Sequence, residues 1–199
     1  MNDNGKTMFC RQCQETFGNA GCTCGGACGK RPETAALMDE LVAALEELAA
    51  AKRPTRELGR FVARSLFLTL TNANFDDARI REALAEAARL LGRKPARSVP
   101  GAFAETDPDA RSVKELVLFG LKGVCAYAHH AAELGRESDE VYDFAFHALK
   151  TFRKERSAAE LAKLALACGR AAVRAMALLD EANPAAYGSP CATEVSLEA

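Results

Sequence analysis

The sequence has no tryptophan among its 199 residues and contains three histidines and three tyrosines. Its 26 basic and 27 acidic side chains nearly cancel, which gives a formal net charge of −1. The chain therefore lacks the excess of positive charge with which nucleic-acid-binding proteins attract phosphates. This balance excludes a nucleic-acid binder that works by bulk electrostatics.

Long hydrophobic runs are also missing. The most apolar stretch, residues 61–70, carries Arg64 and is shorter than the roughly 18 residues needed to cross a bilayer. The first six residues are polar and lack the apolar core of a secretory signal. We therefore expect a soluble, cytoplasmic protein with no membrane partner. In a reducing cytosol, clustered cysteines are more often metal ligands or redox groups than disulfides.

Alanine and leucine dominate what is present, with 40 and 22 residues, and they favour closely packed helices. No glycine-rich phosphate loop follows a strand, and no Ser/His/Asp arrangement stands out. Apolar periodicity predicts an all-α fold of six helices. We expect them from Pro32 to before Pro54, then at about 55–72, 74–92, 112–134, 138–152 and 157–181.

Helix-breaking residues divide these six helices into two groups of three. Residues 93–110 predict a linker or long surface loop, because they are rich in proline and glycine. The expected organisation is a cysteine-rich loop over 1–31, a helical domain over 32–183 and an irregular C-terminal tail over 184–199. Within the helical domain we expect two three-helix bundles, at about 32–92 and 111–183. Expected helix starts are Asn74 and the capping boxes Ser112/Glu115 and Ser157/Glu160.

Five of the eight cysteines lie within residues 10–28. Cys10 and Cys13 form a C-x2-C pair, which places two thiolates on one side of a tight loop. Cys22 and Cys28 follow as a second pair, with Cys24 between them. Four thiolates from two such pairs can complete the ligation of a metal centre.

The residues around these cysteines suit a bulky anionic ligand. Glycines recur between and after the cysteines, and they let the backbone bend and turn its N–H groups toward a ligand. Lys30 and Arg31 add positive charge, and the helix beginning near Pro32 adds the positive end of its dipole.

Three interpretations of the cysteine spacing remain open at this point. A four-cysteine iron–sulfur cluster accounts for the number of thiols and the richness in glycine. A structural zinc site uses the same ligands, but such sites more often repeat the short C-x2-C spacing on both sides. Free thiols would be an oxidation hazard. Outside this region, Cys125 and Cys168 fall on or beside apolar helix stripes and are expected to be core residues.

Several segments resemble one known family. The run from Met8 to Thr16, Met-Phe-Cys-Arg-Gln-Cys-Gln-Glu-Thr, is similar to the N-terminal region of the hybrid-cluster (prismane) proteins, also called hydroxylamine reductases. Residues 21–23, 28–30, 121–131 and 175–188 resemble the first domain of that family as well. The resemblance implies a cubane [4Fe–4S] cluster. Its implied ligands are Cys10, Cys13, Cys22 and Cys28, with Cys24 as a substitute for a neighbouring ligand.

The resemblance also implies a fold and a function. The first domain of the family is helical and is described as two three-helix bundles. Full-length members are considerably longer, and their later domains supply the His, Glu and Cys ligands of the hybrid Fe–S–O cluster that reduces hydroxylamine. No stretch of this chain resembles those later motifs. We therefore expect a [4Fe–4S] electron-transfer protein rather than the complete reductase.

The expected partner is a redox protein, for which a separate chain carrying the hybrid-cluster domains is one candidate. Self-association into a homo-oligomer is a second assembly to consider. Two other functions remain in view. The chain could be a hydroxylamine reductase-type oxidoreductase in its own right, or a helical interaction module that a metal staples together.

Overall fold

The computed structural model describes residues 8–13, 18, 20–96 and 98–192. This part of the chain contains helices and no strands, which confirms the predicted all-α class. No helix within these residues is long and apolar enough to span a bilayer. The helices are α1 (Pro32–Ala51), α2 (Arg56–Leu68), α3 (Asp77–Leu91), α4 (Gly101–Ala104), α5 (Pro108–Glu133), α6 (Asp139–Phe152) and α7 (Ala158–Tyr187).

Six of these helices correspond to the six predicted ones, and the four-residue α4 lies in the predicted linker. The start of α5 differs from the prediction. Asp107 caps this helix by accepting a hydrogen bond from the Ala110 N–H at 2.7 Å, whereas the Ser112 hydroxyl donates to the Pro108 carbonyl. The expected capping box at Ser112 is therefore wrong, because an aspartate just before a proline starts the helix earlier. The other expected capping box, at Ser157, is confirmed.

Two further helix ends differ from the prediction. Asp76 rather than Asn74 is the N-cap of α3, and the Asn74 side chain instead accepts from the Asp76 N–H. Helix α7 continues through Pro184 to Tyr187, where irregular structure was expected from residue 184. A proline this close to a helix end removes one intrahelical hydrogen bond and leaves the last turn intact. The Gly188 N–H still donates to the Pro184 carbonyl at 2.9 Å.

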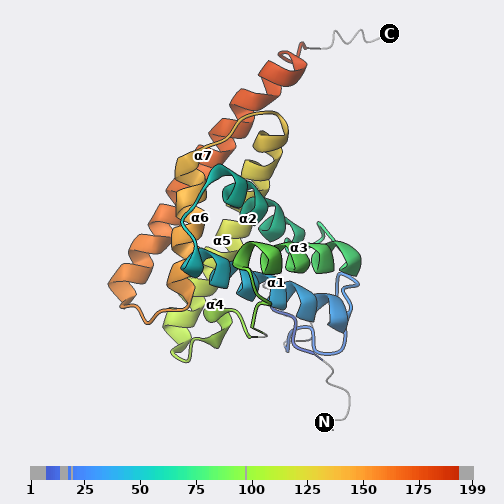
Figure 1. The fold of residues 1–199 in the computed structure, drawn as a ribbon, viewed down its shortest axis with the longest axis vertical. Coiled ribbons are helices and arrows are strands. Elements are labelled where there is room, and N and C mark those ends of the chain that lie inside the picture. Colours follow the sequence, from blue (N-terminus) through green and yellow to red (C-terminus); the bar gives the residue numbers. More distant parts are fainter. Residues whose placement is uncertain (1–7, 14–17, 19, 97, 193–199) are drawn as a thin grey trace, which may run out of the picture.

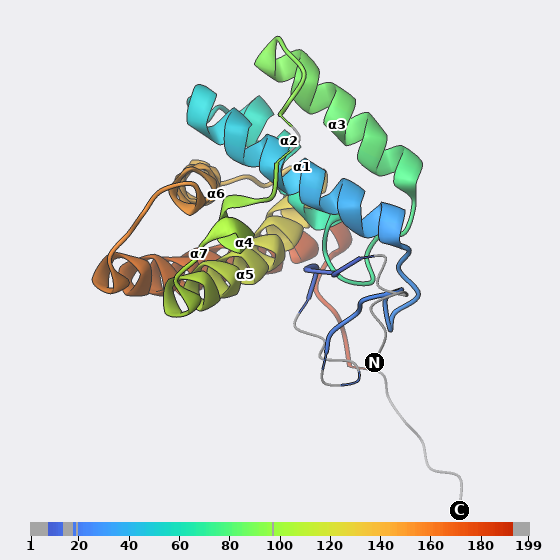
Figure 2. The same cartoon turned by 90° about the horizontal axis from the view of Figure 1, so that it is seen from below.

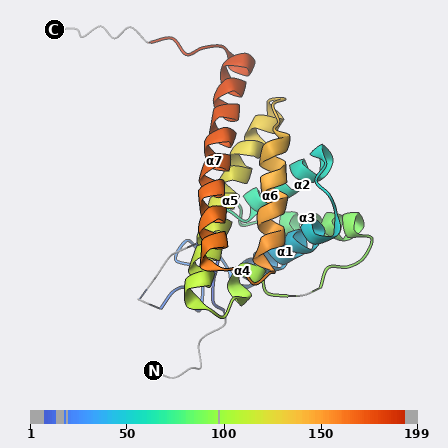
Figure 3. The same cartoon turned by 90° about the vertical axis from the view of Figure 1, so that its left-hand side faces the viewer.

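In Figures 1 and 3, the helices of the later half of the chain, α5–α7, lie side by side, and in the earlier half, α1–α3, helix α1 packs against α3. Helix α2 packs against both α5 and α6, and α1 also packs against α6. The buried apolar side chains of both halves therefore form one connected core. Gly59 permits the close approach of α2 to α6, because a Cβ there would clash with the ring of Tyr142.

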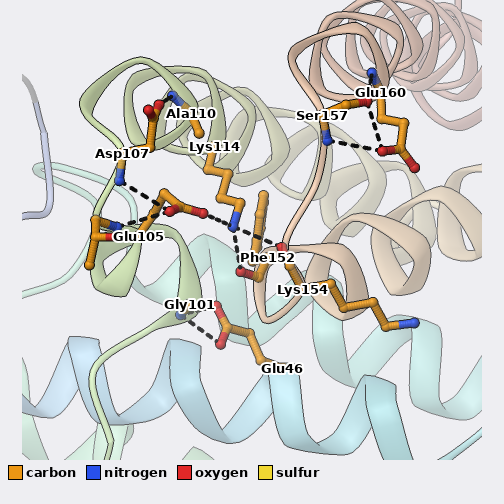
Figure 4. Close-up of polar contacts among 11 residues, drawn as sticks. Glu46, Gly101, Glu105, Asp107, Ala110, Lys114, Phe152, Lys154, Ser157 and Glu160 are labelled. Atoms are coloured by element: carbon orange, nitrogen blue, oxygen red, sulfur yellow. Dashed lines mark hydrogen bonds and ion pairs between the residues drawn. The ribbon is translucent and has the colours of Figure 1, made fainter.

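Two neighbouring carboxylates on α1 hold the segment that joins the two halves. Both side-chain oxygens of Glu46 accept from the Gly101 N–H at 2.9 Å, at the start of α4 (Figure 4). The adjacent Glu47 accepts from the Ala96 N–H at 2.9 Å and lies 2.8 Å from the guanidinium of Arg93. These buried acceptors give the predicted linker a fixed path along α1.

Glu46 is fully buried, and burial raises its pKa to about 7, against the lowering effects of the Gly101 hydrogen bond, Arg153 and Lys114. The native chain therefore keeps a proton between pH 4.5 and 7 that the unfolded chain releases. The free energy of unfolding consequently decreases as pH rises through that window. We expect Glu46→Gln to remove about 2–3 kcal/mol of this decrease. Urea unfolding at several pH values measures it.

Glu82→Gln, on the exposed face of α3, is the matched control and should leave the pH dependence as it is in the wild type. Equal slopes of stability against pH in wild type and Glu46→Gln would show that the Glu46 carboxyl does not titrate in this window.

Candidate metal centre

The cysteine-rich segment precedes α1 and lies against the N-terminal end of that helix and the connection between α2 and α3 (Figure 2). Two hydrogen bonds attach it to this connection. The Thr71 hydroxyl donates to the Gln12 carbonyl at 3.0 Å, and the Lys30 ammonium donates to the Asn74 carbonyl at 3.4 Å. Polar contacts thus hold the segment against this connection.

Backbone pairing joins the two halves of the cysteine motif. The Met8 N–H donates to the Thr23 carbonyl at 3.1 Å, and the Cys10 N–H donates to the Cys22 carbonyl at 3.0 Å. These two bonds place the first C-x2-C pair beside the segment that carries Cys22. Backbone hydrogen bonds therefore bring together residues separated by twelve positions in the sequence.

Cys28 lies in a tight turn that follows. The Gly26 N–H donates to the Lys30 carbonyl at 2.7 Å, and the Gly29 N–H donates to the Gly26 carbonyl at 2.8 Å. Gly29 has φ +87°, a conformation that glycine adopts without strain. A Cβ at Gly26 would lie 3.1 Å from the Cys28 sulfur, so this glycine makes room for the thiol. The turn also brings the Ala27 N–H within 3.3 Å of the Cys22 sulfur, to which it donates.

The four predicted ligands differ in exposure. Cys22 is buried, Cys10 and Cys13 are half-buried, and Cys28 is exposed, as is Cys24. Burial raises the pKa of Cys10, and Cys13 and Cys22 raise it further because a second thiolate nearby is unfavourable. Cys10, Cys13 and Cys22 therefore lie within electrostatic reach of one another.

Two kinds of metal centre use four cysteine ligands. Among the described residues, no group of three or more Cys, His, Asp or Glu side chains is close enough to hold a single metal ion. A tetrahedral zinc site needs all four sulfurs about 2.3 Å from one point. A cubane cluster has four irons, each bound by its own cysteine, and so accepts thiolates that are further apart. The donor set of the loop, four cysteine thiolates, is one that either kind of centre uses.

A buried polar network beneath this loop was not predicted from the sequence. It consists of Gln12, Asp39, Thr69 and Lys122, and we call it the floor of the loop. Gln12, inside the C-x2-C pair, is 2% exposed and donates to an Asp39 carboxylate oxygen at 2.6 Å. The Lys122 ammonium, on α5, donates to the Gln12 side-chain oxygen at 2.9 Å and to the Thr69 carbonyl at 3.2 Å. The available sequence clue was a lysine on the otherwise apolar face of a central helix.

The charges of this floor are strongly perturbed by burial. Burial lowers the pKa of Lys122 to about 8, while Asp39, Cys10 and Cys13 act in the opposite direction. Burial also raises the pKa of Asp39 to about 6, against the effects of nearby Arg11 and Lys122 and of the Gln12 hydrogen bond. Lys122 therefore carries a positive charge at neutral pH and interacts electrostatically with the Cys10 and Cys13 thiols.

The two predicted cations next to the loop have different positions. Lys30 is 1% exposed, lies 4.5 Å from the centre of the Phe75 ring and lowers the pKa of Cys10. Arg31 instead points to solvent and pairs with Asp77 at 2.6 Å. Lys30 thus has the expected electrostatic role beside Cys10, whereas the guanidinium of Arg31 serves to fasten the start of α1 to α3.

The remaining cysteines lie away from the loop or at its surface. Cys125 and Cys168 are buried in the helical core, as predicted, and burial raises the pKa of both thiols. A Cβ on Gly120 would clash with the Cys168 sulfur. The glycine therefore lets α5 and α7 approach closely. Cys191 is exposed beyond the end of α7.

The described residues thus combine an all-helical fold with a loop that carries four candidate cysteine ligands. Comparison with known proteins makes this more specific. Residues 8–199 match the Prismane/CO dehydrogenase family, and the chain belongs to that family, which is one of iron–sulfur proteins.

The chain is similar to relatives named hydroxylamine reductase, of which three illustrate the match. The protein from Nitratidesulfovibrio vulgaris is 40% identical over an alignment that covers 96% of this chain and 42% of the relative. The protein from Chlorobaculum tepidum is 40% identical, with coverages of 94% and 40%. That from Methanocella arvoryzae is 37% identical, with coverages of 96% and 43%. The chain thus spans about two fifths of the length of these relatives.

Proposed function

We propose that Cys10, Cys13, Cys22 and Cys28 hold a [4Fe–4S] cluster and that the protein transfers single electrons through it. The observation that supports this proposal most strongly is the loop itself. Backbone hydrogen bonds join its two cysteine pairs, and its turns are built on glycine. Membership of an iron–sulfur family supports iron over zinc.

When bound, such a cluster supplies a centre that accepts and releases one electron. The residues of this chain have separate roles around it. The four thiolates bind iron, and the glycine turn from Gly26 to Gly29 leaves space for the Cys28 thiol. The buried lysines Lys30 and Lys122 offset the negative charge of four thiolates. The helices provide a rigid support, because α1, α2 and α5 all contribute to the floor.

The partner we propose is a redox protein that exchanges electrons with this centre. The chain covers about two fifths of the length of the named hydroxylamine reductases. We therefore propose that a protein region equivalent to the other three fifths accepts the electron. That region could be on the same polypeptide or on a separate chain. The relatives' name also favours a second candidate function, hydroxylamine reduction by the chain itself.

A redox titration of the anaerobically reconstituted chain tests these functions together. We expect each chain to take up one electron reversibly, as monitored by electron paramagnetic resonance. We also expect no turnover of hydroxylamine with reduced methyl viologen as the electron donor. Turnover well above that of free iron and sulfide would favour the reductase. A bound metal that takes up no electron across the accessible potentials would favour the metal-stapled interaction module.

A further inference from the structure

Lys122 is a buried charge with an unusual set of partners. It lies on the buried face of α5 and is 1% exposed. Its two hydrogen bonds, to the Gln12 side chain and the Thr69 carbonyl, go to neutral oxygens. Gln12 lies between Cys10 and Cys13, and these two thiols are among the charges that act on the Lys122 ammonium. The Lys122 ammonium therefore lies on the side of the cysteine loop that faces α5.

Burying an ammonium group costs several kcal/mol unless an anion compensates it. A second buried lysine on the same helix shows the usual solution. Lys114 is 2% exposed, and its ammonium lies 2.6 Å from a Glu105 carboxylate oxygen, with two carbonyls completing its partners (Figure 4). Within the described part of the chain, Lys122 has no carboxylate at ion-pair distance. Asp39 reaches it through Gln12.

The anion that would compensate Lys122 is the proposed cluster. A [4Fe–4S] centre with four thiolate ligands is an anion in both of its usual states. Its charge becomes more negative by one when an external donor gives it an electron. A fixed cation beneath the loop favours the more negative, reduced state over the oxidised state. In the dry surroundings of a buried side chain this effect is weakly screened by salt.

We propose that Lys122 is the counter-charge of the cysteine loop and that it raises the reduction potential of the cluster. This inference rests on the proposed function, because it needs a cluster in the loop. Gln12 positions the ammonium relative to the two cysteines. Asp39 moderates its charge from the other side of Gln12.

Potentiometry of Lys122→Met and Lys114→Met in the reconstituted full chain tests the proposal. With dithionite as the reductant, we expect Lys122→Met to lower the equilibrium constant for reduction at least tenfold, or about 59 mV for one electron. Lys114→Met removes a buried charge from the same helix, but the Lys114 partners are Glu105, which follows α4, and two carbonyls at and just after the end of α6. It should leave the potential unchanged while reducing stability.

Asp39→Asn is a second variant in case Lys122→Met does not fold. It keeps an acceptor for Gln12 and removes a negative charge, so the potential should move upward. In the metal-free chain, Lys122→Met should lower the urea midpoint less than Lys114→Met does, because the Lys122 ammonium makes no direct ion pair within the described residues.

Two results would overturn the role of Lys122. One is an unchanged potential in Lys122→Met with full iron content, or in Asp39→Asn where Lys122→Met does not fold. The other is a loss of metal-free stability in Lys122→Met as large as that in Lys114→Met. A wild-type chain that binds no cluster would instead refute the proposed function.

Discussion

Cys22→Ala is expected to bind less than about one iron per chain, against about four for the wild type. Cys22 is 6% exposed, the most buried thiol of the loop. Its carbonyl accepts the Cys10 N–H, and its sulfur accepts the Ala27 N–H. These contacts fix the Cys22 sulfur close to Cys10 and to the turn that carries Cys28.

Cys24→Ala is the matched control, because it removes a thiol two residues away whose side chain is exposed. We expect it to retain the iron and sulfide content and the absorption spectrum of the wild type. Both variants keep the glycine turns, so a difference between them reports ligation rather than loop folding. Retention of iron by Cys22→Ala together with its loss in Cys24→Ala would show that Cys24 is the ligand.

Leu121→Ala is expected to lower the free energy of unfolding by about 2–5 kcal/mol. Leu121 is fully buried on α5, in the core shared by both groups of helices. The loss combines the transfer of a leucine side chain to water with the cavity that remains. Because α2 packs against α5 and α6 as well as α1 and α3, both halves should unfold in one transition. Urea unfolding followed by circular dichroism measures both effects.

Leu116→Ala, five residues earlier on the same helix, is the matched control. Leu116 is 57% exposed, so its truncation should change stability by less than about 0.5 kcal/mol. Two separate unfolding transitions, with Leu121→Ala shifting only the transition of α5–α7, would contradict a single shared core. They would instead support two independent three-helix bundles.

The helices could be predicted because their determinants are local. Apolar spacing, caps such as Ser157 and breakers such as Gly92 act within a few residues, and the structure places helices where these patterns predict them. The exceptions have distant causes. The short α4 begins at Gly101, whose N–H is held by Glu46 on α1, 55 residues earlier. No local pattern marks that contact.

The candidate ligands were also predictable, because four cysteines with glycine around them form a compact sequence motif. Their surroundings were not. Lys122 is 110 positions from Gln12, and the contact exists because α5 passes under the loop. Lys30 and Arg31 are adjacent in sequence, yet one is buried beneath the loop and the other pairs with Asp77. Such differences depend on how helices pack, which short-range patterns do not specify.

The proposed function depends on an iron–sulfur cluster in the cysteine loop. The most direct measurement is the iron, acid-labile sulfide and zinc content of the full chain after anaerobic purification. We expect about four irons and four sulfides per chain and no stoichiometric zinc. One zinc per chain without sulfide, in a colourless protein, would contradict the proposed function.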